Sequence, residues 1–159
     1  MECQVLTTDK PLDDEERVDA FIEETARALG FLSDRYGFNL PSTEFDRRAA
    51  TVTVAFTKGG VAIEATHDLR EGDVEVKVAR LEDGGRPKAY QVDREGRRCR
   101  ASLVEILTKR GVRDFGLKPP KRDEISKERF NRLLSRYARL LQDHAADILS
   151  GSAEALERL

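Results

Sequence analysis

The residues of this 159-residue sequence that come nearest to a catalytic pair are His67 and Asp68. An imidazole held by a carboxylate can act as a general base when a cleft brings a substrate to it. No serine or cysteine motif of a nucleophile accompanies the pair. We therefore interpret His67 as an exposed histidine at a strand end. A small hydrolase or transferase that uses His67 and Asp68 is kept as an alternative function.

Other residues that could bind a metal or a cofactor lack the necessary spacing. His144 lies among apolar residues at helical spacing, which indicates a partly buried side chain rather than a metal ligand. Cys3 and Cys99 are far apart, so we expect reduced thiols and no metal site. Gly59-Gly60 and Gly84-Gly85 are typical of turns and belong to no phosphate-loop pattern. We expect no metal, no cofactor and no enzymatic activity.

Two sets of charged residues at helical spacing are candidate partner-binding surfaces. The basic set repeats by three, four and three and consists of Arg129, Arg132, Arg136 and Arg139. The acidic set belongs to the expected start of the first helix and consists of Asp13, Glu16, Asp19 and Glu23. Guanidinium groups on one side of a helix can bind carboxylates or phosphates. An ordinary solvated surface is the default interpretation of both sets, and also of a second basic cluster that consists of Arg94, Arg97, Arg98 and Arg100.

Charge and composition rank the classes of partner. The formal net charge of −2 argues against a protein that binds nucleic acid through bulk charge. The sequence offers no exposed aromatic residues clearly interleaved with the arginines of the last helix. We therefore expect another protein as the partner and rank nucleic acid below it. The opposite charges of the two sets could also pair between two copies and give a homodimer.

The elements that must position these residues begin with an alternating stretch between residues 51 and 80. Apolar side chains at every second position predict three consecutive antiparallel strands, each with one buried face. These apolar residues are Val52, Val54, Phe56, Val61, Ile63, Ala65, Val74, Val76 and Val78. The intervening positions are mostly polar, so we expect the other face of the sheet to be polar.

Helical periodicity flanks this meander on both sides. Apolar stripes predict helices over 12–36, 100–110 and 126–150. Residues 42–46 and 89–92 are candidates for short additional strands, and the two prolines of 118–122 indicate a stiff linker. We predict a single α+β domain over residues 1–159: an antiparallel meander of about four strands, covered on one face by the first and last helices.

The sequence contains no signal for a membrane or an export pathway. No run approaches the roughly 18 apolar residues that cross a bilayer, and the N-terminus lacks a basic start followed by an apolar stretch. Hydrophobic and charged contents of 39% and 36% are typical of a soluble globular protein. We expect a cytoplasmic location.

One arrangement in the sequence resembles a known group of proteins. The segment Phe31-Leu-Ser-Asp-Arg-Tyr-Gly-Phe38 is followed by an alternating strand, then by Gly60-Val-Ala-Ile-Glu-Ala-Thr-His67 in the same meander, and later by Tyr90-Gln-Val92. Over about Phe21 to Leu107 this resembles small, poorly characterised bacterial cytosolic proteins, some grouped with toxin-immunity proteins. The resemblance implies a protein-binding function, such as the neutralisation of a toxin, and assigns no active residue.

Overall fold

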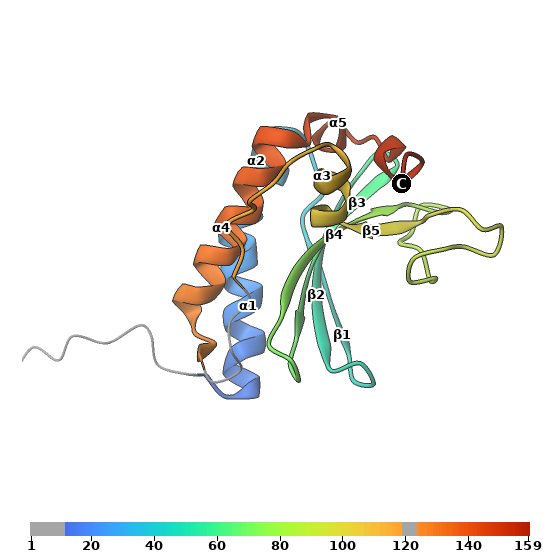
Figure 1. Ribbon diagram of the computed structural model, residues 1–159. Coiled ribbons are helices and arrows are strands. Elements are labelled where there is room, and N and C mark those ends of the chain that lie inside the picture. The colour runs from blue at the N-terminus through green and yellow to red at the C-terminus, as the bar shows by residue number, and fades with distance from the viewer. Residues whose placement is uncertain (1–11, 119–123) are drawn as a thin grey trace, which may run out of the picture.

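The computed structural model describes residues 12–118 and 124–159, so Cys3 and most of the expected linker 118–122 lie outside the described residues. Five antiparallel strands form one sheet in chain order (Figure 1). The strands are β1 (Ser42–Asp46), β2 (Thr51–Lys58), β3 (Val61–Asp68), β4 (Val74–Arg80) and β5 (Arg100–Ser102). The described helices are α1 (Asp14–Leu29), α2 (Phe31–Tyr36), α3 (Leu103–Lys109), α4 (Lys127–His144), α5 (Ala146–Leu149) and the 3-10 turn η2 (Glu154–Leu156). The predicted α+β class is confirmed.

The two faces of the sheet differ because successive side chains of a strand point to opposite sides. The register of β2, β3 and β4 aligns fully apolar rows on one face, one of which consists of Val54, Ala65 and Val76. All three of these side chains are buried. The neighbouring row on the opposite face consists of Thr53, Thr66 and Glu75. The predicted division into an apolar and a polar face is therefore present.

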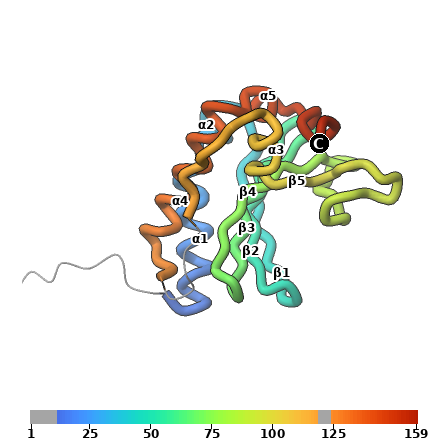
Figure 2. Tube along the Cα trace, viewed as in Figure 1, coloured from blue at the N-terminus to red at the C-terminus, as the bar shows by residue number. Residues whose placement is uncertain are grey.

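Helices α1 and α4 lie side by side over the apolar face of the sheet (Figures 1 and 2). Phe21 of α1 and Phe130 and Leu134 of α4 are fully buried between the two helices and the strands. Burial of a side chain of this size stabilises the fold by roughly 1.5–3 kcal/mol. The first and last helices thus form one layer, as predicted, although they are far apart in the sequence.

The helix ends follow the expected capping chemistry. The Asp13 side chain accepts a hydrogen bond from the Glu16 amide at 2.9 Å, and the Glu16 side chain accepts one from the Asp13 amide. The Ser126 hydroxyl accepts from the Arg129 amide and so caps α4. Gly37 ends α2 with a left-handed φ of 77°, a conformation that favours glycine. Side chains thus cap the starts of α1 and α4, and a glycine ends α2.

Within the predicted helix 12–36, residues 14–36 form two helices in close succession that meet at Gly30. A Cβ atom at this position would lie 2.6 Å from the carbonyl oxygen of Ala26, which is closer than side-chain atoms approach a backbone oxygen. Glycine is therefore required by the close approach of the preceding helical turn.

The predicted helix 100–110 starts too early. Its first three residues form β5, which pairs with β4, and α3 follows directly. The hydroxyl of Ser102 accepts a hydrogen bond from the Glu105 amide at 3.0 Å, so Ser102 is the N-cap of α3. The helical stripe was correct, but its N-cap lies two residues after the predicted start.

Two further predictions about elements are wrong in part. Residues 89–92 form no strand and contain only an isolated bridge between Val92 and Arg98. The predicted helix 126–150 is interrupted at Ala145, whose φ of −130° and ψ of 39° are not helical. As a result α4 and α5 are separate helices.

Lys58 joins the C-terminal ends of two helices. Its Nζ atom donates hydrogen bonds to the carbonyl oxygens of Tyr36, at the end of α2, and of Leu149, at the end of α5. The carbonyl end of a helix carries partial negative charge, so one ammonium group stabilises both ends. The hairpin between β2 and β3 is thereby attached to the C-terminal part of the chain.

Candidate functional site

His67 lies in the core and not at the surface. The side chain is fully buried between Phe21 and Phe130, with ring centroids 5.5 and 4.9 Å from the imidazole. Its Nδ1 atom lies 3.1 Å from the carbonyl oxygen of Asp73. Burial is the main cause that lowers the pKa of His67, because a charged imidazole would lose its hydration. The interpretation of His67 as an exposed histidine is therefore wrong.

Asp68 points away from His67, as neighbouring residues of a strand do. Its carboxylate accepts hydrogen bonds from the backbone amides of Arg70 and Glu71 at 2.8 and 3.0 Å and so stabilises the turn after β3. The arrangement places the imidazole and the carboxylate on opposite sides of the strand. It supplies neither the orienting contact nor the cleft that a general base requires.

His144 also differs from its prediction. The side chain is exposed at the end of α4, whereas the sequence indicated partial burial. The apolar stripe of α4 ends at Leu141, and the helix itself ends at His144. The backbone carbonyl of His144 accepts a hydrogen bond from Arg110, so this residue has a structural contact through its main chain.

The acidic set on α1 is engaged mainly within the chain. Asp13 and Glu16 form the capping box, and Glu23 lies 3.0 Å from the ammonium group of Lys127 at the start of α4. The Lys127 hydrogen bond lowers the pKa of the Glu23 carboxyl group. Asp19 is exposed. The opposite charges of the first and last helices therefore meet inside one molecule at Glu23 and Lys127.

The four arginines of α4 divide into two engaged and two exposed side chains. Arg129 lies 2.8 Å from Glu124, and the Nε atom of Arg136 donates to the carbonyl oxygen of Phe115 at 2.6 Å. The exposed side chains are those of Arg132 and Arg139. Neither makes an ion pair or a hydrogen bond with a side chain of the described residues. The structure thus places the four on one side of α4 but gives them different surroundings.

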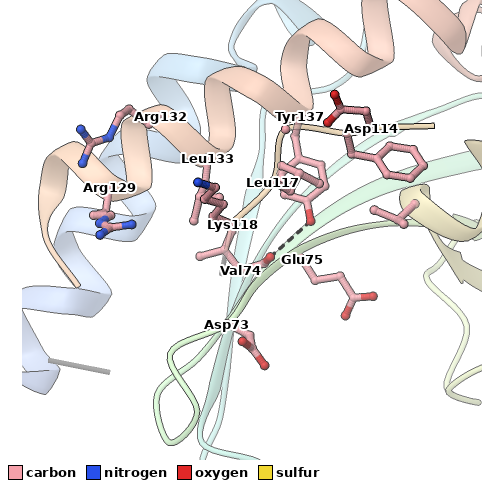
Figure 3. Close-up of a pocket in the computed structure, with 13 residues that line it drawn as sticks. Asp73, Val74, Glu75, Asp114, Leu117, Lys118, Arg129, Arg132, Leu133 and Tyr137 are labelled. Atoms are coloured by element: carbon pink, nitrogen blue, oxygen red, sulfur yellow. Dashed lines mark hydrogen bonds between the residues drawn. The ribbon is translucent and has the colours of Figure 1, made fainter. Parts of the chain in front are cut away.

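Two of the predicted residues, Arg129 and Arg132, line a groove of about 730 Å³ between α4, the start of β4 and the segment 112–118 (Figure 3). Its apolar lining consists of Val74, Val104, Phe115, Leu117, Leu133 and Tyr137. Arg136 is turned to the backbone of Phe115, and Arg139 does not line the groove. Of the predicted arginine set, only Arg129 and Arg132 therefore line the groove.

Both acidic and basic side chains line this groove. Arg129 and Arg132 lie toward one end, whereas Glu75 and Asp114 lie toward the other (Figure 3). Lys118 also lines the groove. A ligand that fits this arrangement is mainly apolar and carries a carboxylate where it meets the arginines, because guanidinium groups bind carboxylates through charge-assisted hydrogen bonds.

Tyr137 forms part of the groove floor and contacts the edge of β4. Its hydroxyl donates a hydrogen bond to the carbonyl oxygen of Val74 at 3.3 Å (Figure 3). Burial, followed by the nearby Glu75 carboxylate, raises the pKa of Tyr137 to about 12. The sequence predicted Tyr137 only as part of an apolar stripe and gave no sign of this contact.

Glu64, Arg86 and Arg100 form a buried ion cluster on the opposite face of the sheet. The Nε atoms of Arg100 and Arg86 each lie 2.6 Å from one carboxylate oxygen of Glu64. Arg100 also donates to three backbone carbonyl groups of the segment 81–99. The interpretation of Arg100 as a solvated arginine is wrong, because its partner comes from β3. An isolated glutamate within the apolar strand was the signal for this cluster.

A second hollow, of about 690 Å³, lies beside the ion cluster on the polar face. Its lining includes Glu64, Arg86 and Arg100, which pair with one another, and Glu44, whose carboxylate lies 3.0 Å from Arg86. Thr53 and Thr66 share a hydrogen bond of 3.0 Å across β2 and β3 in the same hollow. The contacts of Arg86 and Arg100 attach the segment 81–99 to the polar face of the sheet.

Within residues 12–118 and 124–159, no three side chains of histidine, cysteine, aspartate or glutamate are arranged to hold a metal ion. Cys99 is a buried free thiol whose pKa is raised by burial. None of the described helices combines the length and the apolar character needed to cross a membrane. The groove along α4 is therefore the best-defined candidate site. No family model, curated protein or solved structure matches this chain.

Proposed function

We propose that this chain is a non-enzymatic binding protein that holds a segment of another protein in the groove along α4. The observation that carries the proposal is the combination of an apolar floor with an arginine-lined end in one groove of about 730 Å³. A toxin that the chain neutralises by covering part of its surface is one partner of this kind.

The floor of the groove supplies the favourable free energy for such a partner. Burial of apolar surface contributes roughly 25 cal/mol per Å², so one or two apolar side chains seated beside Leu133 and Phe115 stabilise a complex measurably. Arg132 has no competing side chain among the described residues, and its guanidinium group is available to a carboxylate of the partner.

Two features of the groove favour protein over nucleic acid. Its lining includes Asp73, Glu75 and Asp114, which repel a phosphate backbone. Its apolar floor suits side chains, and the whole chain has a net charge of −2. A homodimer through the charged helices is less favoured, because Glu23 and Lys127 already pair within one chain.

The chain offers a matched pair of variants for testing this proposal. Arg132 and Arg139 are both exposed on α4, but only Arg132 lines the groove. Affinity capture from the source cell is compared for the wild type, Arg132→Glu and Arg139→Glu. We expect the partner protein to be lost with Arg132→Glu and retained with Arg139→Glu.

The alternatives give different results in the same experiment. Equal loss in both variants would assign binding to the net charge of α4 and contradict a groove site. Capture of nucleic acid alone, with affinity that falls steeply as salt rises, would favour the nucleic-acid alternative. Recovery of only the chain itself would favour a homodimer.

A random peptide display library tests the chemistry of the ligand independently of the source cell. We expect wild-type protein to enrich sequences with an acidic residue next to apolar residues, and Arg132→Glu to lose these sequences. A library that yields no enriched sequence with the wild type would contradict the proposed function.

A further inference from the structure

The first part of β4 has an open edge where it faces the groove. β5 pairs only with Lys77 to Ala79, and the chain then leaves the sheet to form α3. No strand of the described residues pairs with the outer edge between Val74 and Val76. An unpaired edge presents backbone amides and carbonyls that can pair with an additional strand.

Tyr137 occupies this open edge with a side chain. Its hydroxyl donates a hydrogen bond to the Val74 carbonyl at 3.3 Å. In an antiparallel sheet, a residue that directs its amide and carbonyl away from one neighbour directs them toward the other. The Asp73 carbonyl accepts from the Asp68 amide of β3, so the next residue, Val74, directs its carbonyl to the outer edge. The carbonyl that Tyr137 satisfies is therefore one of the groups that a strand added to β4 would use.

We propose that the partner segment binds in an extended conformation and adds to the edge of β4 at Val74 and Val76, displacing the hydroxyl of Tyr137. This inference rests on the proposed function, because it concerns the same groove. Asp73, Val74 and Glu75 of the open edge line that groove, so an added strand lies within it.

The charges beside the edge define the chemistry of the segment. One side of the groove is α4, with Arg129 and Arg132, so the segment carries a carboxylate that faces this helix. Its apolar side chains, which alternate along an extended chain, contact Leu133 and Leu117. A segment of another protein with alternating apolar residues and one acidic residue is the occupant.

A conservative change at Tyr137 tests displacement. In Tyr137→Phe the edge is no longer occupied by a hydroxyl, so binding breaks one hydrogen bond fewer. Peptides enriched by the display library should bind Tyr137→Phe about two- to tenfold more tightly than the wild type, as one net hydrogen bond allows. Tyr90→Phe is the control, because Tyr90 is exposed on the segment 81–99 and does not line the groove.

A second measurement uses wild-type protein and varies the peptide backbone. N-methylation removes one amide donor at a time along an enriched peptide. In an added strand every second amide pairs with β4, so binding should be lost at alternate positions and kept at the positions between them. Loss at consecutive positions would indicate a bound helix and overturn the inference.

The outcomes separate this inference from the function on which it rests. Enriched peptides that need Arg132 but bind Tyr137→Phe no more tightly than the wild type would overturn strand addition and leave the groove function intact. Absence of enriched peptides would overturn both. Self-association of Tyr137→Phe without peptide, measured by sedimentation, would assign the edge to a second copy and also overturn the proposal.

Discussion

Replacement of His67 by phenylalanine tests how a buried imidazole links the stability of this fold to pH. His67 is surrounded by Phe21 and Phe130, and its Nε2 atom has no hydrogen-bond partner among the described residues. Burial, followed by a smaller contribution from Arg17, lowers its pKa. The carbonyl of Asp73 and the carboxylates of Asp68 and Asp73 act in the opposite direction and do not reverse the shift.

The sign and the size of the effect follow from this shift. An unfolded histidine titrates near its ordinary pKa of about 6.5, whereas the folded imidazole takes up a proton only at lower pH. At a pH between the folded and unfolded pKa values of His67, the unfolded state binds about one proton more than the folded state. The contribution of His67 to stability is therefore complete above about pH 6.5, and the free energy of unfolding falls below it by up to about 1.36 kcal/mol per pH unit.

The assay is urea unfolding of the wild type and of His67→Phe at a series of pH values between about 5 and 8. We expect the pH dependence to be much flatter in His67→Phe. The substitution leaves no carbonyl without a donor, because the Asp73 oxygen also accepts from the Asp68 amide at 2.9 Å. Lowered carboxyl pKa values, such as that of Asp147 beside Arg110, affect stability mainly at lower pH.

The only other histidine of the chain provides the control. His144 is exposed at the end of α4, so His144→Gln should keep the wild-type slope. An unchanged slope in His67→Phe, or a slope that disappears in His144→Gln, would refute the assignment of the pH dependence to the core histidine.

Three other substitutions test the sheet and the first helix pair. Val76→Asp places a charge at a fully buried position and should abolish the folded far-UV circular dichroism spectrum; a wild-type spectrum would contradict the core assignment. Glu64→Leu leaves the Arg100 guanidinium without its buried partner and should lower the free energy of unfolding by about 3 kcal/mol in urea titrations, against a change near zero if the cluster is solvated. Alanine has a helix propensity about 1 kcal/mol more favourable than that of glycine. Gly30→Ala should nevertheless lower the thermal midpoint, because its Cβ would lie 2.6 Å from the Ala26 oxygen. A higher midpoint would refute this reasoning.

The sheet could be predicted because its signal is local. Alternation within each strand fixed which residues share a face, and Gly59-Gly60 placed the hairpin between β2 and β3. The same alternation also indicates a buried position for His67, because His67 continues the buried series of Val61, Ile63 and Ala65. The prediction failed there because a polar residue type was given more weight than the period of the strand.

The groove could be predicted only in part because its walls come from distant segments. The spacing of the arginines predicted that they share one side of α4. Their different roles depend on the irregular segment 112–118, which brings the Phe115 carbonyl to Arg136 and leaves Arg132 exposed. Helical periodicity contains no information about such a segment, and the contact of Tyr137 with β4 depends on where β5 ends.

The attachment of Lys58 to the ends of α2 and α5 has a consequence for the order in which the chain folds during synthesis. One of its two acceptors, Tyr36, leaves the ribosome before Lys58, whereas Leu149 follows much later. The layer opposite the sheet is likewise incomplete until α4 emerges beside α1. The nascent meander therefore exposes an apolar face for most of its synthesis, a state in which chaperones recognise unfinished proteins.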